Sequence, residues 1–528
     1  MNRTGSLSGV PHQVPLRPTR PVETPLREVA SWLGGDLVGV RGDPARASTP
    51  VTGVTISSLR VQPGDLYVAP AGSRAHGATF AGRAVAEGAV AVLTDPEGLG
   101  VLDRPEGASR RSLDAPVLVV EHPRAVVGGL AARIYGSPAE QMRLVAVTGT
   151  QGKTTTTRLA EAALTTAGVA AAVVGTVGTR VNGVEVKTSL TTPEAPDLHA
   201  LFAVMVEQQV TACAMEVSSH ALVMGRVDGV VFDVACFTNL GRDHLDFHVD
   251  LEDYFAAKAS LFTPARSRLG LVNIDDDHGR RLVREAQVPV RTYSVHDPLA
   301  DWHASDVRLE RTGSSFTVRD PAGRTFPAEV PLAGDFNVAN ALCAIAALGE
   351  AGFDAAAVAE AMGGSGGVPG RLEQVDAGQP FLAVVDYAHK PDAVAAALTA
   401  LRPLTTGRLI VVIGAGGDRD PGKRPMMGEV AARLADVVVV TDDNPRSEDP
   451  AAIRAQLRAG AESVPAADRA DLHEVGDRRA AIRLAVSLAV PGDTVVVAGK
   501  GHETGQEVGG RTHPFDDRHV LREELAAR

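Results

Sequence analysis

Short apolar runs that each end in polar or glycine-rich residues recur along the chain, and they predict an α/β protein. In the N-terminal part these runs alternate with alanine-rich stretches of helical character; they are GDLYVAP, GAVAVLTD and APVLVVE. Apolar strands that alternate with helices favour parallel sheets covered on both faces. We therefore expect a small α/β domain over residues 26–142.

Two further series of apolar runs follow. The second runs from LVAVTGT through TACAMEVSS, VFDVACFTNL and RLGLVNID to a helical stretch, NVANALCAIAALGEAG. After the glycine-rich GGSGGVPGR, which is typical of a linker, come FLAVVDYAH, RLIVVIGAGG, ADVVVVTDDNP and DTVVVAGKG. This doubly wound pattern places ligands at the carboxyl ends of strands. The predicted fold class is α/β with three domains, the second a central phosphate-loop parallel-sheet domain (143–368) and the third a C-terminal Rossmann-like domain (369–528).

The first 25 residues are rich in proline and polar side chains, and they predict a disordered leader over residues 1–25. They lack the apolar core of a signal peptide, and no later run reaches the roughly eighteen apolar residues that span a bilayer. The chain has 52 Lys and Arg against 64 Asp and Glu, and its formal charge of -12 repels polyanions. We expect a cytoplasmic monomer that neither binds nucleic acid nor inserts into a membrane.

The three cysteines, Cys213, Cys236 and Cys343, are widely spaced and form no CxxC pair. This spacing predicts neither a disulfide framework nor a zinc site. We expect buried free thiols in a reducing compartment.

The stretch VAVTGTQGKTTTTRLA reads as a strand, a glycine turn and a helix start, which is typical of a phosphate-binding loop. Gly149 and Gly152 let backbone N–H groups approach phosphate oxygens, Lys153 can neutralise a β- or γ-phosphate, and Thr154 is placed to bind Mg²⁺. The strict pattern GxxxxGK[ST] needs glycine where this chain has Val147, so a merely structural glycine turn is the alternative.

The shortened form of this loop resembles the Mur ligase family, the ATP-dependent amino acid ligases of peptidoglycan assembly, together with folylpolyglutamate synthetase. Further motifs carry the resemblance, in the order that the family has them along the chain. GDLYVA precedes the loop, and after it come TTPEA, MEVSSHAL, TNLGRDHLDFH, YFAAKASLF, GDFNVANALCA, VPGRLE, VVDYAHKPDA, GGDRDPGKRP, DDNPR and AGKGHE. The resemblance implies that ATP, with Mg²⁺, phosphorylates a substrate carboxylate and that an amine attacks the acyl phosphate. The implied partners are UDP-N-acetylmuramoyl-L-alanyl-D-glutamate and meso-diaminopimelate.

The resemblance also assigns residues to the nucleotide and the metal. Its ATP-binding residues are Gly149, Thr150, Gln151, Gly152, Lys153, Thr154, Thr155, Asn337, Arg371 and Asp386. Its metal ligands are Thr154, Glu216, His244 and Lys258, the last as a carbamate formed with CO₂, and its catalytic residues are Lys153, His244 and Lys258. Carbamylation needs a neutral amine, hence a lysine with a lowered pKa. An alternative, a zinc pair of His244 with His248, lacks a third ligand pattern.

For the sugar-nucleotide substrate, the resemblance implies a site across the first two domains. Its residues are Ser58, Thr191, Thr192, Ser218 and Arg226. The family's Asp-Ser-Arg signature is altered, because Ser57 and Leu59 flank the serine, and Met224 stands where some members have glutamine.

The segment TDDNPRSEDP predicts a turn after an apolar strand, in which Arg446 can grip a carboxylate with two parallel hydrogen bonds. A turn with a solvated arginine is the alternative. The segment resembles the DNPR signature of diaminopimelate-adding members, whose substrate has a second carboxylate that lysine lacks. The implied amino acid site comprises Arg419, Asp443, Asn444, Arg446, Gly499 and Glu503, with Glu503 suited to the distal ammonium group. A dinucleotide fingerprint in VVIGAGGDRD fails, because Arg419 stands where glycine is needed.

Two other functions stay open at this point. A sister ligase that adds L-lysine, or a folylpolyglutamate-type ligase, shares the chemistry. An inactive NTP-binding regulatory protein belongs to a different class.

Overall fold

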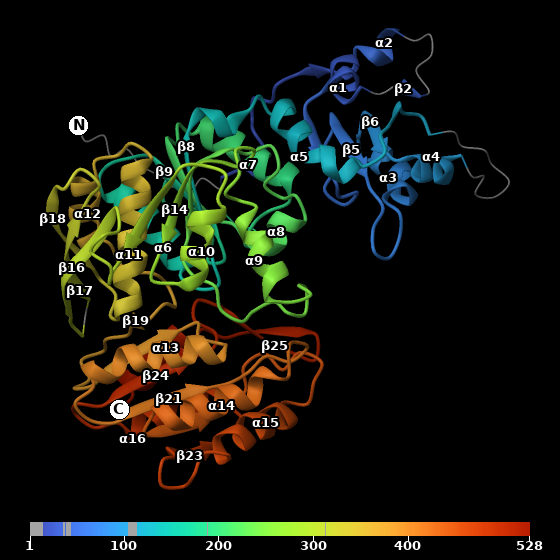
Figure 1. Ribbon diagram of the computed structural model, residues 1–528. Coiled ribbons are helices and arrows are strands. Elements are labelled where there is room, and N and C mark those ends of the chain that lie inside the picture. The colour runs from blue at the N-terminus through green and yellow to red at the C-terminus, as the bar shows by residue number, and fades with distance from the viewer. Residues whose placement is uncertain are drawn as a thin grey trace, which may run out of the picture.

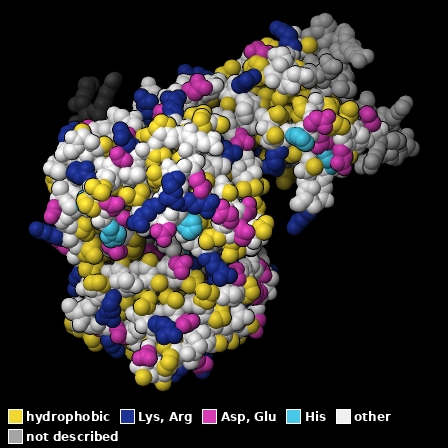
Figure 2. Space-filling view, in the orientation of Figure 1, with side chains coloured by type: hydrophobic (Ala, Val, Ile, Leu, Met, Phe, Trp, Pro, Cys, Tyr) yellow, Lys and Arg dark blue, Asp and Glu magenta, His cyan; other side chains and the backbone are white. Residues whose placement is uncertain are grey.

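The computed structural model describes residues 14–34, 37–38, 44–103, 113–186, 188, 190–311 and 313–528. Three sheets follow one another along the chain, and the first domain projects to one side of the other two (Figure 1). The space-filling view shows the C-terminal domain directly against the central domain (Figure 2). The architecture is α/β with parallel sheets, as the sequence pattern predicts.

The first sheet has the strand order β2-β7-β6-β5-β4, and its strands are parallel except for β2 at the edge. Its strands are β2 (Leu37–Val38), β4 (Gly53–Thr55), β5 (Asp65–Ala69), β6 (Ala91–Thr94) and β7 (Val117–Val119). A two-stranded pair, β1 (Thr24–Pro25) and β3 (Pro50–Val51), lies beside it. The helices are α1 (Leu26–Leu33), α2 (Pro44–Ala47), α3 (Ala81–Ala86), α4 (Pro96–Leu102) and α5 (Pro123–Ile134), with 3-10 turns η1 (Gly77–Phe80) and η2 (Pro138–Gln141).

The central sheet has eleven strands in the order β11-β10-β9-β12-β8-β13-β14-β15-β16-β17-β18. The strands from β9 to β16 in this order are parallel; they are β9 (Ala171–Gly175), β12 (Ala212–Glu216), β8 (Arg143–Thr148), β13 (Phe232–Phe237), β14 (Ser267–Asn273), β15 (Val290–Ser294) and β16 (Trp302–Leu309). Antiparallel strands extend both edges; they are β10 (Gly178–Val181), β11 (Val184–Val186), β17 (Ser314–Arg319) and β18 (Thr325–Val330). The sequence pattern did not predict these extensions, because their half-exposed strands alternate polar and apolar residues instead of forming apolar runs.

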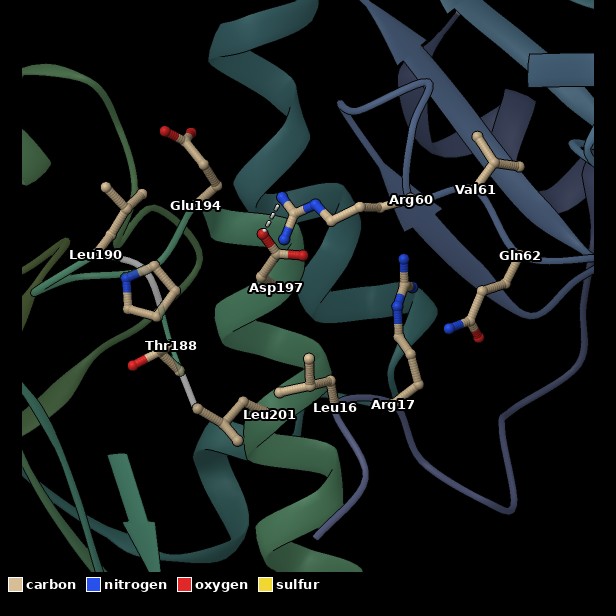
Figure 3. Close-up of a pocket in the computed structure, with 11 residues that line it drawn as sticks. Leu16, Arg17, Arg60, Val61, Gln62, Thr188, Leu190, Glu194, Asp197 and Leu201 are labelled. Carbon is tan, nitrogen blue, oxygen red and sulfur yellow. Dashed lines mark hydrogen bonds and ion pairs between the residues drawn. The ribbon is translucent and has the colours of Figure 1, made fainter. Parts of the chain in front are cut away.

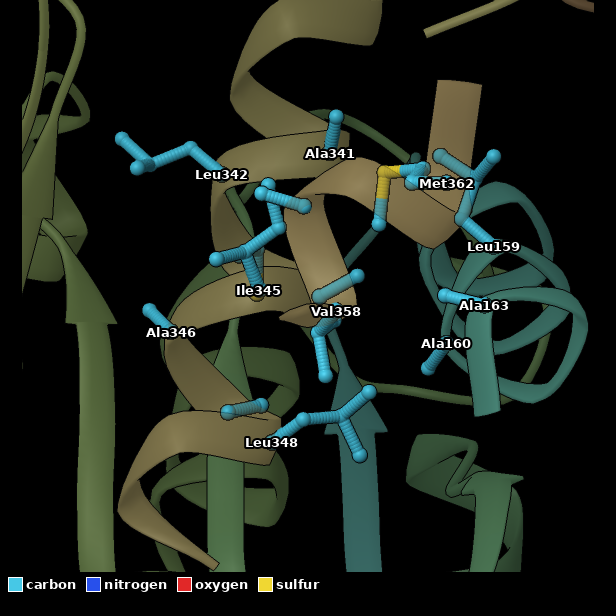
Figure 4. Close-up of a cluster of buried hydrophobic side chains, with 14 of the residues drawn as sticks. Leu159, Ala160, Ala163, Ala341, Leu342, Ile345, Ala346, Leu348, Val358 and Met362 are labelled. Atoms are coloured by element: carbon cyan, nitrogen blue, oxygen red, sulfur yellow. The ribbon is translucent and has the colours of Figure 1, made fainter. Parts of the chain in front are cut away.

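Helices cover both faces of the central sheet. They are α6 (Lys153–Thr166), α7 (Ala195–Glu207), α8 (Ser219–Val223), α9 (Leu251–Ala259), α10 (Asp277–Glu285), α11 (Asp335–Glu350) and α12 (Ala355–Gly363). Alternate residues of β8 face opposite cores: Val145 and Val147 pack with α6, α11 and α12, whereas Leu144 and Ala146 pack with α7. Figure 4 shows the apolar side chains of α6, among them Leu159, Ala160 and Ala163, beside those of α11 and α12. The continuous apolar run of β8 therefore reflects burial on both sides.

The C-terminal sheet has the order β19-β20-β24-β21-β22-β23 and is parallel except for β19. Its strands are β19 (Glu373–Gln374), β20 (Leu382–Asp386), β21 (Leu409–Ile413), β22 (Val437–Val440), β23 (Asp471–Glu474) and β24 (Thr494–Ala498). The helices are α13 (Pro391–Leu401), α14 (Lys423–Leu434), α15 (Pro450–Glu462), α16 (Arg478–Leu488) and α17 (Asp517–Ala526), with the turn η3 (Arg402–Leu404). A hairpin of β25 (Gly505–Val508) and β26 (Arg511–Pro514), which the sequence pattern did not predict, follows β24.

The leader differs from the prediction over residues 14–25. The backbone N–H groups of Thr19 and Arg20 donate to the Glu207 carboxylate at 2.9 and 2.7 Å, and the Arg17 guanidinium pairs with Asp65. These contacts join the leader to α7 and to β5. The composition of the leader predicts disorder, but two carboxylates from distant segments hold residues 17–20 in place. Residues 1–13 lie outside the described residues. No helix among the described residues is long and apolar enough to cross a membrane.

Candidate active site

The segment between β8 and α6 forms a glycine loop at the carboxyl end of a central strand. Gly149 has φ 145° and Gly152 has φ 86°, both in the region that favours glycine. A Cβ on Gly149 would lie 1.9 Å from Thr238 Oγ1, and one on Gly152 would lie 2.3 Å from Asn340 Oδ1. Only glycine fits both positions, which is why the motif needs them here.

Two lysines converge on this loop. Lys153 Nζ donates to the carbonyls of Gly149 and Thr150 at 2.7 and 3.1 Å, and Lys258 Nζ from α9 donates to the same Gly149 carbonyl at 2.9 Å. Desolvation lowers the pKa of Lys153 to about 8. Burial, together with the charge of Lys153, lowers the pKa of the 1% exposed Lys258 well below its usual range. The arrangement favours a neutral amine on Lys258.

A carboxylate and a hydroxyl face the same cavity, which measures about 710 Å³. Glu216, at the end of β12, accepts hydrogen bonds from the backbone N–H and the hydroxyl of Thr176 at 2.8 and 3.0 Å. Thr154 Oγ1, in the first turn of α6, accepts one from Arg371 at 3.1 Å. No cluster of three or more His, Cys, Asp or Glu is placed to hold a metal among the residues described. This sparse set fits Mg²⁺, which is held by one or two carboxylates and by substrate phosphates.

His244 lines this cavity at a strained position, with φ 53°. Its ring Nε2 lies 3.1 Å from Asp243 Oδ2, and burial lowers the pKa of His244 to about 4. Lys390 of the C-terminal domain pairs with Asp243. Burial alone would raise the pKa of Asp243, but the charges of Lys390 and His244 outweigh it and bring that pKa to about 2.

His248 does not join His244 in a zinc pair. Its Nδ1 lies 2.9 Å from Asp253 Oδ2, and its Nε2 lies 2.9 Å from Ser219 Oγ. Both ring nitrogens are therefore engaged by the protein. The ring holds the loop before α9 against α8.

The residues assigned to the nucleotide lie together, although they come from different domains. Asn337, Arg371 and Asp386 line the same cavity as the glycine loop. The Arg371 guanidinium carbon lies 4.6 Å from the Tyr387 ring centroid. The Asp386 carboxylate accepts hydrogen bonds from the N–H groups of Leu372 and Ala388 at 2.7 and 2.8 Å, and its burial raises its pKa. Asp386 therefore also fixes the chain where the C-terminal domain begins.

Asn337 is nearly fully buried near the start of α11. Its amide donates to the Ala333 carbonyl at 2.7 Å and accepts from Asn340 at 3.2 Å. Asn340 in turn approaches Gly152, so this pair of asparagines shapes the wall beside the glycine loop.

The residues assigned to the sugar-nucleotide substrate divide into two groups. Thr191, Ser218 and Arg226 line the large cavity, whereas Thr192 is buried and donates to the Glu216 carbonyl at 2.9 Å. Ser58 lines neither this cavity nor the second one described below.

Arg226 is tied to neighbouring residues on the cavity wall. Its Nε lies 2.9 Å from Glu194 Oε1, and its Nη2 lies 3.4 Å from the sulfur of Met224. Met224 therefore packs against Arg226 as a weak acceptor.

A second cavity of about 450 Å³ lies between the first domain and α7 (Figure 3). Arg17 from the leader and Arg60 from the loop after β4 approach it from one side, and Asp197 of α7 pairs with Arg60 at 2.7 Å. Leu190 lines both cavities, so the two adjoin. Ser58 stands two residues before Arg60, which lines this second cavity.

In the C-terminal domain the loops after β21 and β22 bring two arginines together. A Cβ on Gly416 would lie 3.1 Å from Arg446 Nη1 and 3.9 Å from Arg419 Cγ, so both arginines flank this glycine. Arg419 is exposed and also lines the large cavity. Of the residues that the sequence assigns to the amino acid, Arg419 therefore shares a cavity with the phosphate loop.

The other assigned residues surround a buried lysine. Lys500, which is 0% exposed, donates to Asn444 Oδ1 at 3.0 Å and to Glu503 Oε2 at 3.1 Å, and it lies 3.8 Å from Asp443 Oδ1. Asn444 also donates to Glu503 at 2.8 Å. A Cβ on Gly499 would lie 2.4 Å from Asp443 Oδ2, which requires glycine there.

Sequence reasoning missed several residues of these sites; they are Asn340, Asp243, Lys390, Lys500 and Glu507. Signals existed for some of them. Lys390 stands in VVDYAHKPDA and Lys500 in AGKGHE, each directly after a buried strand where ligands are expected. Glu507 carried no local signal, because its partner lies 61 positions earlier in the chain.

Comparisons with known proteins agree with this architecture. Three family models match the chain: "Mur ligase family, catalytic domain" at residues 50–135, "Mur ligase middle domain" at 147–348 and "Mur ligase, glutamate ligase domain" at 370–501. The chain belongs to the Mur ligase family.

Among individual relatives, the chain is 54% identical over 512 residues to UDP-N-acetylmuramoyl-L-alanyl-D-glutamate--2,6-diaminopimelate ligase of Streptomyces coelicolor, covering 97% of this chain and 98% of that protein. It is 48% identical over 508 residues to the protein of the same name from Corynebacterium glutamicum, covering 94% and 97%. A solved structure of a ligase with this name matches with a TM-score of 0.65 and 33% identity, covering 96% of this chain and 99% of that one.

Proposed function

We propose that the protein is an ATP-dependent ligase that joins meso-diaminopimelate to UDP-N-acetylmuramoyl-L-alanyl-D-glutamate during peptidoglycan precursor synthesis. The names of relatives that match nearly the whole chain support this substrate pair. The observation that carries the proposal is one cavity that extends from the glycine loop to Arg419, beside Arg446.

In the proposed reaction the phosphates of ATP bind at the glycine loop. Lys153 leaves the loop carbonyls and neutralises the transferred phosphate, and the backbone N–H groups at the start of α6 bind its oxygens. Thr154 and Glu216, with His244 nearby, would hold Mg²⁺, which would supply charge that stabilises phosphoryl transfer. The products of this step are ADP and an acyl phosphate on the D-glutamate carboxylate of the substrate. The diaminopimelate amine then attacks the acyl carbon, loses a proton and displaces inorganic phosphate.

Lys258 is proposed to react as a neutral amine with CO₂. Its burial beside Lys153 disfavours a second ammonium group at the Gly149 carbonyl. Addition of CO₂ to the neutral amine, with loss of one proton, would place an anionic carbamate within reach of the phosphate loop, where it would serve as a further metal ligand.

The sugar-nucleotide part of the substrate is proposed to lie across the first two domains. The second cavity provides two arginines, Arg17 and Arg60, at a place that adjoins the peptide-binding residues Thr191 and Arg226 through Leu190 (Figure 3). Guanidinium groups suit a diphosphate, because they donate several hydrogen bonds in one plane. Ser58, two residues before Arg60 in the chain, is assigned to the same ligand.

The amino acid site is proposed to distinguish diaminopimelate from lysine through charge. Arg446 and Arg419 suit the extra carboxylate, and Glu503 suits the distal ammonium group. Because the residues come from the C-terminal domain and the phosphate loop from the central one, closure of the C-terminal domain brings the amine to the acyl phosphate. We propose that the three domains, with the boundaries predicted from the sequence, are the units that move relative to one another.

An amino acid competition assay tests the proposal. The purified protein is supplied with ATP, Mg²⁺, UDP-N-acetylmuramoyl-L-alanyl-D-glutamate and either meso-diaminopimelate, L-lysine or L-glutamate, and the ligated product is quantified. We expect product with diaminopimelate, and little ATP hydrolysis when both peptide substrates are left out. Preferred use of L-lysine or L-glutamate would favour a sister ligase or a folylpolyglutamate-type ligase, and no product with any amino acid would favour an inactive NTP-binding protein.

A further inference from the structure

The guanidinium of Arg446 is held by an internal carboxylate in addition to a loop carbonyl. Its Nε donates to Glu507 Oε2 at 3.1 Å, and its Nη1 donates to the Gly417 carbonyl at 2.6 Å. Glu507 belongs to β25, in the hairpin that follows the last strand of the C-terminal sheet. Two contacts from different segments therefore define the plane of the guanidinium.

The backbone of Glu507 fastens the same loop. Its carbonyl accepts a hydrogen bond from the Arg446 N–H at 3.0 Å, and its N–H donates to Asn444 Oδ1 at 2.9 Å. Gly509 N–H donates to the Arg446 carbonyl at 2.7 Å. Arg446 has φ 53°, an uncommon conformation that this strand-like pairing maintains. Backbone and side chain of Glu507 thus act on one residue.

The contacts with Glu507 and Gly417 leave further donors of Arg446 for a ligand. A guanidinium has five N–H donors, and an edge with two parallel N–H groups binds a carboxylate in bidentate fashion. In the described part of the chain, no protein atom accepts a hydrogen bond from Arg446 Nη2. Nη1 lies beside Gly416, because a Cβ there would be 3.1 Å from Arg446 Nη1 and 3.9 Å from Arg419 Cγ, and Glu507 holds the guanidinium at Nε.

The ion pair itself contributes little to folding. The side chain of Glu507 is 44% exposed and that of Arg446 is 23% exposed, and pairs this open to water are weakly stabilising. The effect of Glu507 is therefore on the direction of the Arg446 side chain, which otherwise rotates about several bonds.

We propose that Glu507 is a positioning residue that sets amino acid selectivity by orienting Arg446 toward the second carboxylate of a diamino dicarboxylic acid. The inference rests on the proposed function, because it takes Arg446 as the carboxylate-binding residue. Substrate meets an arginine whose plane is already set, so less conformational freedom is lost on binding.

Three variants of the full-length protein test this role. Glu507→Ala removes the acceptor, Glu507→Gln keeps an oxygen that accepts from Nε, and Glu429→Ala is the matched control. Glu429 is 43% exposed and pairs with Arg433 at 3.0 Å on α14. The KM and kcat for meso-diaminopimelate, the kcat/KM for L-lysine, the KM for ATP and the thermal unfolding of each variant are measured.

We expect Glu507→Ala to raise the KM for diaminopimelate about tenfold and to lower the preference for diaminopimelate over lysine by the same factor, as for loss of an oriented charge-assisted hydrogen bond. The kcat, the KM for ATP and the unfolding temperature stay at wild-type values. Glu507→Gln restores most of the selectivity, and Glu429→Ala behaves as wild type.

An unchanged or lowered KM for diaminopimelate in Glu507→Ala would overturn the inference. The Glu507 carboxylate would then either have no effect on substrate binding or compete with the substrate carboxylate for Arg446. Parallel losses in kcat, ATP binding and unfolding temperature, with no rescue by Glu507→Gln, would show a merely structural role. If wild-type protein ligates no diaminopimelate, the proposed function fails and the inference falls with it. If wild type ligates it and Glu507→Ala matches wild type, the inference alone fails.

Discussion

Two lysines on opposite sides of the domain interface illustrate two ways of placing a charge. Lys153 in the phosphate loop donates to the carbonyls of Gly149 and Thr150, and desolvation lowers its pKa to about 8. Lys500 in the proposed amino acid site is fully buried but lies among Asn444, Glu503 and Asp443. Carbonyl dipoles compensate an ammonium group less well than carboxylates do.

The difference agrees with what each site is proposed to bind. A phosphate brings several negative charges, so a loop with uncompensated positive charge gains most when ATP arrives. An amino acid brings charges of both signs, so the site that takes it presents balanced charges and selects by geometry. Removing Lys153 is therefore expected to stabilise the fold, whereas removing Lys500 is expected to destabilise it, and this contrast can be tested.

The largest effect is expected for Lys153→Met. Loss of the ammonium group removes charge stabilisation of the transferred phosphate, and kcat falls on the order of 10²- to 10³-fold. Single-turnover phosphate release in the presence of all substrates measures the loss. Turnover close to wild type would assign phosphate neutralisation to another cation, such as Arg371 or Lys390.

Lys500→Met is expected to destabilise the C-terminal domain by roughly 3–5 kcal/mol, because Glu503 and Asp443 lose their buried partner. Urea unfolding followed by circular dichroism measures the change. Arg433→Met, which breaks an exposed pair with Glu429, is the control and costs at most about 1 kcal/mol. Equal urea midpoints for the two variants would contradict the larger stability contribution expected of the buried lysine.

Lys258→Ala is expected to lower kcat on the order of 10²-fold, as for loss of a metal-orienting group. If the carbamate acts as a metal ligand, acetate or formate partly restores turnover, because a free carboxylate occupies the space left by the side chain. The assay compares rates with and without added acetate at constant ionic strength. Failure of every short carboxylate to restore activity would leave the carbamate without support.

Arg446→Ala is expected to raise the KM for diaminopimelate about tenfold or more while ATP binding is unchanged. Arg446→Lys should recover little, since an ammonium group does not reproduce a bidentate contact. Initial-rate kinetics with each substrate varied in turn measure both constants. Equal losses toward ATP and diaminopimelate would contradict the assigned role.

The smallest effect concerns pH. The pKa of Lys153 lies near 8 when folded and near 10.5 when unfolded, so the folded state binds fewer protons between these values and wild-type stability rises with pH across this window. Below pH 8 the destabilisation is fully present. We expect nucleotide-free Lys153→Met to unfold at a higher temperature than wild type at pH 7, with the advantage shrinking toward pH 10. A constant advantage at both pH values would exclude Lys153 titration as its cause.

Parts of these sites were predictable because they lie within short motifs. The glycine loop, with Gly149, Gly152 and Lys153, needs only neighbouring residues for its chemistry. The contact of Glu507 with Arg446 was not predictable, because it forms only when the hairpin packs against a loop 61 positions earlier in the chain. The folding of residues 14–25 onto α7 and β5 was missed for the same reason, since its acceptors, Glu207 and Asp65, are distant in sequence.

The amino acid sequence by itself determined the α/β class, the order of the buried parallel strands, and the residue types at the ends of those strands. Apolar runs specify strands buried on both faces, and glycines specify where the backbone turns or approaches closely. Tertiary structure alone decided which of those residues meet. Desolvation and neighbouring charge exist only in the folded chain, and they make Lys258 a candidate neutral amine and Glu507 the partner of Arg446.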